Sequence, residues 1–266
     1  MDRHDSKNGQ VNLLRHAVIT AGSKGLGKKV TEQFLEMGCS VTVNYRSDVT
    51  RVSQLMTEWE PYQDQLHFVQ GDVTKKEDIA NIIKQAMKRF GRIDYLINNA
   101  GPYVFERKKL VDYEEKEWYE VINGNLNAVF HFLKLTIPIM RNQKYGRIIT
   151  YGFQDAEHTP GWINRSAFAA AKAGLVSLTK TVALEEAEYG ITANMVCPGD
   201  IIGDMKEADI ETARLLKDSN TPVGRSGTGE DIGRIIRFLC EDNSDFITGS
   251  VIAASGGIQV VNRGLK

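Results

Sequence analysis

Short apolar runs alternate with amphipathic segments along the chain. The apolar runs are rich in β-branched residues, which predicts strands at 17–20, 40–45, 66–72, 93–101, 147–151, 191–199 and 250–255. Apolar side chains recur at helical spacing between them, which predicts helices over 26–37, 49–59, 75–90, 115–141, 164–188 and 229–241. Because each crossover is a helix, the chain is expected to form one α/β domain, a doubly wound parallel sheet with helices on both faces.

The stretch RHAVITAGSKGLGK at 15–28 carries the first chemical signal. An apolar strand breaks there into a glycine turn that opens a helix, with Gly25 and Gly27 on either side of Leu26. Glycine lacks a Cβ, so backbone N–H groups can approach a phosphate closely, and the helix dipole favours that anion. A dinucleotide pyrophosphate fits this pattern, although an ordinary tight turn between a strand and a helix shares it. In such sheets ligands bind outside the carboxyl ends of the strands, where the polar turns lie.

The composition and net charge argue against nucleic acids and acidic membranes as binding partners. The chain has 266 residues, 42% hydrophobic and 25% charged, with a net charge of −1, so no global field attracts nucleic acid or an acidic membrane. No apolar run approaches the roughly 20 residues of a membrane span. Residues 1–14 are mostly polar and lack a leader's apolar core, so they are expected to be a flexible extension preceding a single domain at 15–266.

The cysteines indicate neither a disulfide framework nor a metal site. Cys39, Cys197 and Cys240 are odd in number, widely spaced and without a CxxC pair. A reducing, cytoplasmic environment is therefore expected.

Several ordered motifs resemble the short-chain dehydrogenase/reductase family. Besides the glycine turn they are Asp72, NNAG at 98–101, NGNLNAVF at 123–130, PG at 198–199, GRSGTGEDIGRIIRFL and ITGSVIAASGG. The match covers about residues 15–260 and is most similar to the 3-oxoacyl-(acyl-carrier-protein) reductases. The resemblance implies a Rossmann-type sheet of seven strands, a nicotinamide cofactor and homo-oligomers, commonly tetramers but also dimers, packed partly through the helices at 115–141 and 164–188.

The resemblance also implies a set of cofactor-binding positions. These are Thr20, Gly22, Ser23, Lys24, Gly25, Leu26, Gly27, Arg46, Asp72, Val73, Asn99, Gly101, Lys172, Pro198 and Gly199. The family usually has glycine directly after the first-strand threonine, whereas this chain has Ala21, which predicts a tilted turn.

The end of the second predicted strand favours NADP over NAD. An acidic side chain there would accept a hydrogen bond from a ribose 2′-hydroxyl and repel a 2′-phosphate. The sequence instead reads NYRS, with Arg46 able to pair with phosphate oxygens and Lys24 adding charge from the other side. Asp48 lies close enough in sequence to keep NAD open as an alternative.

The catalytic residues that the family implies are incomplete. Its members use a tyrosine as general acid, a lysine four residues later, a serine and an asparagine. Lys172 and Asn125 match, but Phe168 occupies the tyrosine position, and Gly152 and Phe153 replace a pair of serines. A phenyl ring cannot donate a proton, and the loss of a general acid typically lowers a rate by roughly 10²–10⁴-fold.

A neighbouring residue could replace the missing acid. In an extended strand Tyr151 would point to the same side as Phe153, and His158 and Tyr103 are further candidates. Two functions therefore stay open. One is an NADP-dependent oxidoreductase, resembling 3-oxoacyl-thioester reductases, that is weak or uses a relocated acid on a small-molecule or acyl-thioester substrate. The other is an inactive NADP-binding sensor, regulatory subunit or scaffold.

The segment at 200–221 is more polar than its neighbours. It is expected to be a mobile helical excursion whose charged side chains face solvent, and in the family it forms a substrate lid. It shows no apolar acyl groove.

Overall fold

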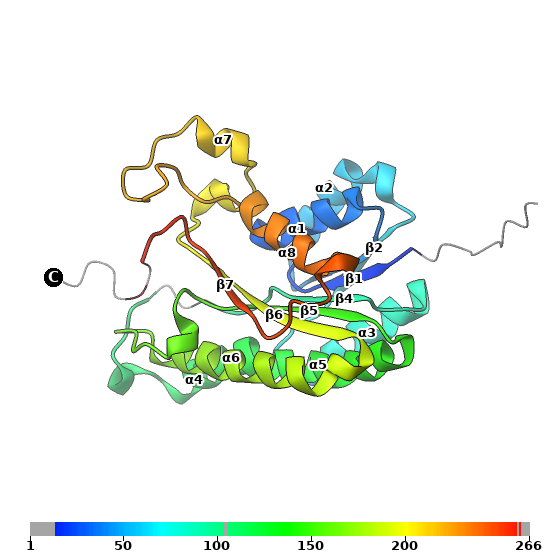
Figure 1. Cartoon of the computed structure of the whole chain (residues 1–266), viewed down its shortest axis with the longest axis horizontal. Coiled ribbons are helices and arrows are strands. Elements are labelled where there is room, and N and C mark those ends of the chain that lie inside the picture. The colour runs from blue at the N-terminus through cyan, green and yellow to red at the C-terminus, as the bar shows by residue number, and fades with distance from the viewer. Residues whose placement is uncertain (1–13, 104–105, 260, 262–266) are drawn as a thin grey trace, which may run out of the picture.

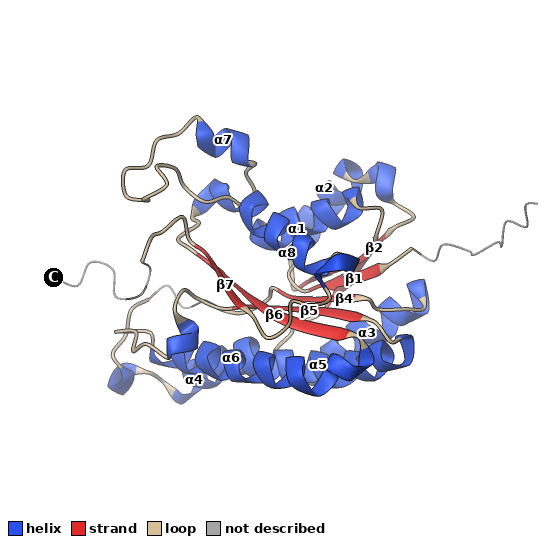
Figure 2. Cartoon of the chain, in the orientation of Figure 1, coloured by secondary structure: helices blue, strands red, loops and turns tan. Residues whose placement is uncertain are grey.

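The computed structural model describes residues 14–103, 106–259 and 261, so most of the predicted extension lies outside it. Seven parallel strands form one sheet in the order β3-β2-β1-β4-β5-β6-β7 (Figure 2). Their bounds are β1 (His16–Ile19), β2 (Ser40–Tyr45), β3 (Leu66–Gln70), β4 (Tyr95–Asn98), β5 (Gly146–Tyr151), β6 (Ile191–Pro198) and β7 (Val251–Ala254). The predicted doubly wound α/β fold is confirmed.

Helices cover both faces of the sheet, as Figure 1 shows. One layer holds α1 (Gly25–Glu36), α2 (Val49–Glu58) and α8 (Gly229–Cys240). The other holds α3 (Lys76–Phe90), α4 (Glu115–Ile122), α5 (Ala128–Gln143) and α6 (Ser166–Glu186). The short α7 (Ile210–Arg214) lies beyond the carboxyl ends of the strands, on the side of α1 and α8.

The two layers enclose separate apolar cores, and the strands alternate between them. Val18 and Ile148 pack toward α3, α5 and α6, whereas their neighbours Ile19 and Ile149 pack toward α1 and α8. Both faces of the sheet are covered, which explains why the strands are continuous apolar runs in the sequence.

The prediction of a single helix over 115–141 is wrong in one respect, because the observed helix is interrupted. A π-helical segment, η3 (Asn123–Asn127), separates α4 from α5. Asn125 Nδ2 donates to Val121 O (3.0 Å) and to Pro102 O (2.9 Å). A Cβ added at Gly124 would lie 2.2 Å from Pro102 Cδ. The helix therefore widens where the chain after β4 packs directly against it.

The 200–221 segment contains η6 (Gly203–Lys206) and α7, as its helical prediction required. The expectation that its charges face solvent is wrong for Glu207, which is half-buried and forms an ion pair with Arg51 of α2. Asp209 stays exposed, although it forms an ion pair with Lys29 of α1. Pairing with these basic side chains fastens the segment to the helical layer above the sheet.

One described helical stretch, Ser166–Tyr189, is long and apolar enough to cross a membrane by length and composition, contrary to the sequence-based expectation. Its Leu175, Val176 and Val182 pack in the core beneath the sheet. Core packing accounts for the same composition.

Candidate functional site

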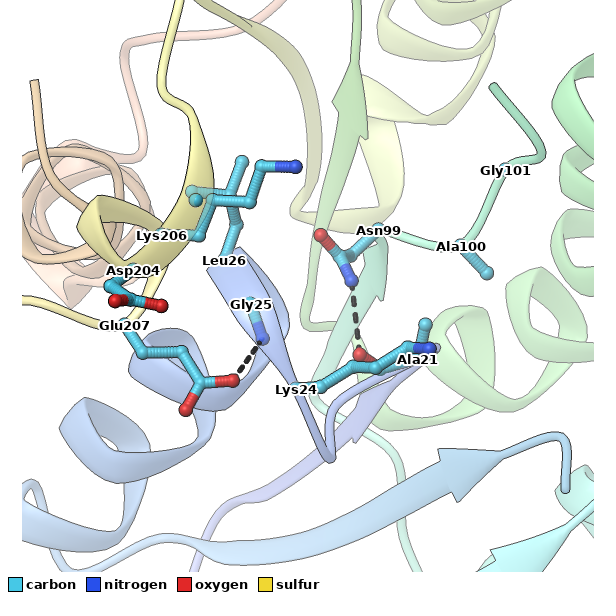
Figure 3. A pocket seen from close by; sticks show the side chains of 11 residues that line it. Ala21, Lys24, Gly25, Leu26, Asn99, Ala100, Gly101, Asp204, Lys206 and Glu207 are labelled. Carbon is cyan, nitrogen blue, oxygen red and sulfur yellow. Dashed lines mark hydrogen bonds between the residues drawn. The ribbon is translucent and has the colours of Figure 1, made fainter. Parts of the chain in front are cut away.

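The strand order reverses between β1 and β4, and the turns after these two strands line a cavity of about 780 Å³. Its walls are the glycine turn, residues 99–101 and part of the segment 203–207 (Figure 3). A second cavity, of about 250 Å³, lies over the ends of β2 and β3 and shares Lys24 and Gly101 with the first. The crevice where the strand order changes is the place where such sheets bind ligands.

Most of the predicted cofactor-binding residues meet at these cavities. The residues that line one or both are Ser23, Lys24, Gly25, Leu26, Arg46, Asp72, Val73, Asn99 and Gly101. Thr20, Gly22, Gly27, Lys172, Pro198 and Gly199 line neither. Thr20 instead joins the turns, because its Oγ1 accepts from Ala100 N at 2.8 Å.

The glycine turn is held by close backbone packing. Ala21 itself takes a left-handed conformation (φ 50°), and Asn99 Nδ2 donates to its carbonyl oxygen at 3.2 Å. A Cβ at Gly27 would lie 2.3 Å from Ala21 O. A Cβ at Gly101 would lie 2.4 Å from Asn125 Oδ1. Gly27 and Gly101 therefore leave the space in which the two turns and η3 approach each other.

Asn44 organises the end of β2, which the sequence did not indicate. Its side chain accepts from Ala21 N (3.3 Å) and donates to Gly71 O (2.9 Å), which connects the turns after β1 and β3. The alternative carboxylate, Asp48, accepts from Arg51 N at 2.9 Å and so caps α2. Arg46 is exposed beside the smaller cavity.

Asp72 lines the smaller cavity. Its partial burial acts to raise its pKa, but hydrogen bonds from Thr74 N and Oγ1 and the charges of Arg46 and Lys75 outweigh this and hold the pKa below its ordinary value. The carboxylate therefore stays ionised and can accept hydrogen bonds from a ligand.

Lys172 is buried beneath the site. Its Nζ donates to Tyr151 O at 2.8 Å, and burial lowers its pKa to about 8. The nitrogen lies 5.6 Å from the centroid of the Phe168 ring, one turn earlier on α6. The Lys172 ammonium thus donates a hydrogen bond to the Tyr151 carbonyl oxygen and lies within cation–π distance of the Phe168 ring.

An aromatic cluster, Tyr103, Phe153, Trp162 and Phe168, fills the space around that ring. Phe168 meets Tyr103 edge-on at 5.1 Å between centroids, and Phe153 meets Trp162 at 5.0 Å. The Arg165 guanidinium lies 4.5 Å from the Tyr103 centroid. Within the cluster only Tyr103 carries a hydroxyl group.

Tyr151 and Phe153 do not point to the same side, so that prediction is wrong. Tyr151 packs with the core under α1 and α8, whereas Phe153 packs with the core beside α6. The strand ends at Tyr151, and the following chain turns, so the alternation of an extended strand stops there. Burial raises the pKa of Tyr151, and its hydroxyl is buried with no hydrogen-bond partner among the described residues. His158 is exposed on η4 (Ala156–His158).

Asn125 presents an unused acceptor. Its Nδ2 is bound to two carbonyl oxygens, while its Oδ1 is buried without a hydrogen-bond partner in the described part of the chain. Such an atom normally pairs with a protein group or an ordered water.

Comparison with known proteins agrees with this geometry. A family model described as enoyl-(acyl carrier protein) reductase matches residues 20–259. The "Putative oxidoreductase YtkK" of Bacillus subtilis is 66% identical over 251 residues, 94% of this chain and 98% of that protein. The chain belongs to the short-chain dehydrogenase/reductase family.

Other members of the short-chain dehydrogenase/reductase family are similar along nearly the whole chain. The 3-oxoacyl-[acyl-carrier-protein] reductase FabG of Staphylococcus epidermidis is 34% identical, covering 92% of this chain and 98% of its own. A solved structure of a "putative 3-oxoacyl-reductase" from Bacillus thuringiensis is 65% identical, with a TM-score of 0.89, and covers 93% of this chain and 99% of that one. This chain is thus similar to short-chain oxidoreductases over a complete domain.

Sequence reasoning missed Glu207. Its Oε1 accepts from Gly25 N at 2.8 Å, so a carboxylate from the segment after β6 lies at the start of α1 (Figure 3). The two residues are far apart in sequence, and no local pattern connects them.

Proposed function

We propose that this short-chain oxidoreductase binds NADP(H) and resembles 3-oxoacyl-thioester reductases, with two of the family's four catalytic positions substituted. The observation that carries the proposal is the convergence of the glycine turn, Arg46 and Asp72 on adjoining cavities at the β1–β4 switch. The close approach at Gly27 and Gly101 supports a turn built for a dinucleotide. We also propose a homotetramer or homodimer in the cytoplasm.

Arg46 and Lys24 would bind a 2′-phosphate. Both are exposed beside the smaller cavity, whereas Asp48 is engaged as the cap of α2. The nicotinamide, when bound, supplies or accepts a hydride. Lys172 would hold positive charge beneath the site, and Asn125 Oδ1 would position a water molecule.

Titration with NADPH and NADH, followed by fluorescence, tests the choice of cofactor. The wild type is expected to bind NADPH more tightly than NADH. Arg46→Ala should weaken NADPH binding by about 10-fold to 100-fold, because a charge-assisted hydrogen bond contributes roughly 1.5–3 kcal/mol, and leave NADH binding unchanged. Arg237→Ala, an exposed arginine on α8, is the control. Equal loss for both cofactors would contradict the 2′-phosphate assignment.

The aromatic cluster favours a second candidate, an NADP-binding sensor, regulatory subunit or scaffold without reductase activity. Phe153 and Phe168 occupy the positions that would supply the carbonyl-polarising hydroxyl and the proton. Among the other candidates, the side chain of Tyr151 is buried in the core under α1 and α8, and His158 is exposed.

A restoration experiment separates the two functions, with a 3-oxoacyl thioester and NADPH as substrates. If the wild type is inactive and Phe168→Tyr with Phe153→Ser creates turnover, the substituted positions explain the inactivity. If the wild type is active and Tyr151→Phe or His158→Gln abolishes turnover, a relocated acid is supported. An active wild type that tolerates both changes would rule out these two donors.

A further inference from the structure

The segment after β6 reaches back to the start of α1 through Glu207. One carboxylate oxygen, Oε1, accepts from Gly25 N at 2.8 Å. The other, Oε2, accepts from Arg51 at 2.6 Å and lies 3.9 Å from Lys28 Nζ. The Glu207 carboxylate thus contacts one backbone N–H donor and two cationic side chains of α1 and α2.

These groups are the ones that a cofactor phosphate would need. Gly25 N–H belongs to the first turn of α1, where backbone donors have no partner within the helix and the dipole favours an anion. Gly25 and Glu207 line the same cavity, beside Lys24 and Leu26 (Figure 3). A carboxylate therefore occupies the position that an anion would take at the start of α1.

We propose that Glu207 is an internal substitute for a cofactor phosphate and must leave the start of α1 before the dinucleotide binds. The inference rests on the proposed function. Departure of Glu207 frees Gly25 N–H and Arg51 together, so binding of the phosphate and opening of the segment are coupled. Lys28 keeps its shorter ion pairs with Glu32 and Glu58. The carboxylate competes with the cofactor and lowers its apparent affinity.

The neighbouring contacts allow such a movement to be local. Asp209 pairs with Lys29 at 2.6 Å, and Ile210 N donates to Glu230 at 2.6 Å. Both contacts lie after Glu207 in the chain and away from Gly25 N. They can hold α7 in place while residues 203–207 move, since Gly203 already has a left-handed backbone (φ 54°) in open space.

Two measurements on the full-length protein test the proposal, with Glu207→Gln as the variant and Asp209→Asn as the matched control. Glutamine keeps the size of the side chain and removes its charge. Hydrogen exchange at residues 203–208 of cofactor-free protein is expected to be faster in Glu207→Gln. The same variant is expected to bind NADPH about 10-fold more tightly, whereas Asp209→Asn changes the affinity less than about 2-fold.

Unchanged or weaker NADPH binding by Glu207→Gln would overturn the inference, because Glu207 would then not compete with the cofactor. If neither protein binds NADPH or NADH, the proposed function fails, and inorganic pyrophosphate replaces the dinucleotide as the probe. If pyrophosphate makes hydrogen exchange at residues 203–208 faster in the wild type but not in Glu207→Gln, displacement of Glu207 by an anion is supported. If pyrophosphate does not change hydrogen exchange in the wild type, the inference is overturned.

Discussion

Ala21 is an alanine in a conformation that favours glycine. Its φ of 50° places its Cβ close to its own backbone, which costs about 1–2 kcal/mol for a residue other than glycine. The strain persists because Asn44 and Asn99 bind the N–H and the carbonyl on either side of it. The turn after β1 is thus maintained by side-chain hydrogen bonds at a position where glycine would carry no strain.

Ala21→Gly is therefore expected to raise the free energy of unfolding by up to about 1 kcal/mol, the relief of strain less the extra entropy of glycine in the unfolded chain. Ala187→Gly is the control, because Ala187 is exposed with a helical φ of −56°. Urea titration of both variants measures the change. The free energy of unfolding of Ala187→Gly should fall by about 0.5–1 kcal/mol. Equal losses at both positions would show that the turn at Ala21 carries no strain.

Lys172 gives a second prediction, in the dependence of stability on pH. Burial lowers its pKa to about 8 from an ordinary value of 10.5, so between these values the unfolded chain binds more protons than the folded one. The unfolding free energy contributed by Lys172 therefore rises with pH through this window and is flat below about pH 8. The gain by about pH 9.5 should be roughly 2 kcal/mol.

Urea unfolding of the wild type and Lys172→Met at several pH values measures this gain. Every other titrating group is common to the two proteins, so it cancels in their difference. The lost hydrogen bond to Tyr151 O shifts the difference by a constant. A difference that stays level from about pH 7 to pH 9.5 would show that the lysine titrates near its ordinary value.

At the residue scale the sequence predicted some positions well and others poorly, for a physical reason. Ser23, Lys24, Arg46 and Asp72 could be predicted to converge, because each lies in the turn after a strand and parallel strands end at one edge. The orientation of Tyr151 could not, since it depends on where β5 stops and the chain turns. The Glu207 contact couples positions 182 residues apart and leaves no periodic signal.

At the scale of elements, most strands and helices were predictable because each has its own apolar pattern. Helix α3, for example, follows its predicted 75–90 range to within a residue and ends at Gly91 in a left-handed conformation. The interruption at η3 was not predictable, because it arises from bonds between Asn125 and the turn after β4 rather than from a local breaker.

The structure of η3 makes a prediction for Asn125. Asn125→Ala would remove the hydrogen bonds to the buried Val121 carbonyl and the partly buried Pro102 carbonyl, so the free energy of unfolding should fall by about 1–3 kcal/mol. Asn127→Ala, in the same segment but with an exposed bond to Asn123, should change it by less than about 0.5 kcal/mol. Thermal unfolding of the two variants provides the comparison. A similar small change in both would mean that Asn125 does not hold η3.

At the scale of the molecule, the sheet order places the ligand cavities on one edge and leaves the outer surfaces of the helices free for association. The layer of α5 and α6 faces outward below the sheet (Figure 1). Leu184 of α6 is 82% exposed, and Phe130 and Leu135 of α5 are exposed as well. The proposed oligomer would cover these side chains, which a monomer leaves in water.

Light scattering after size exclusion tests this proposal. The wild type is expected at two or four times the chain mass of 29.7 kDa, and Leu184→Glu should lower that mass because a buried charge without a partner opposes association. Met56→Glu places the same charge at an exposed site of α2, in the opposite layer, and should leave the mass unchanged. Leu184 is exposed in the single chain, so neither variant should lower the helical content. A monomeric wild type would overturn the oligomer, and a Leu184→Glu protein of unchanged mass would place the interface away from this part of α6.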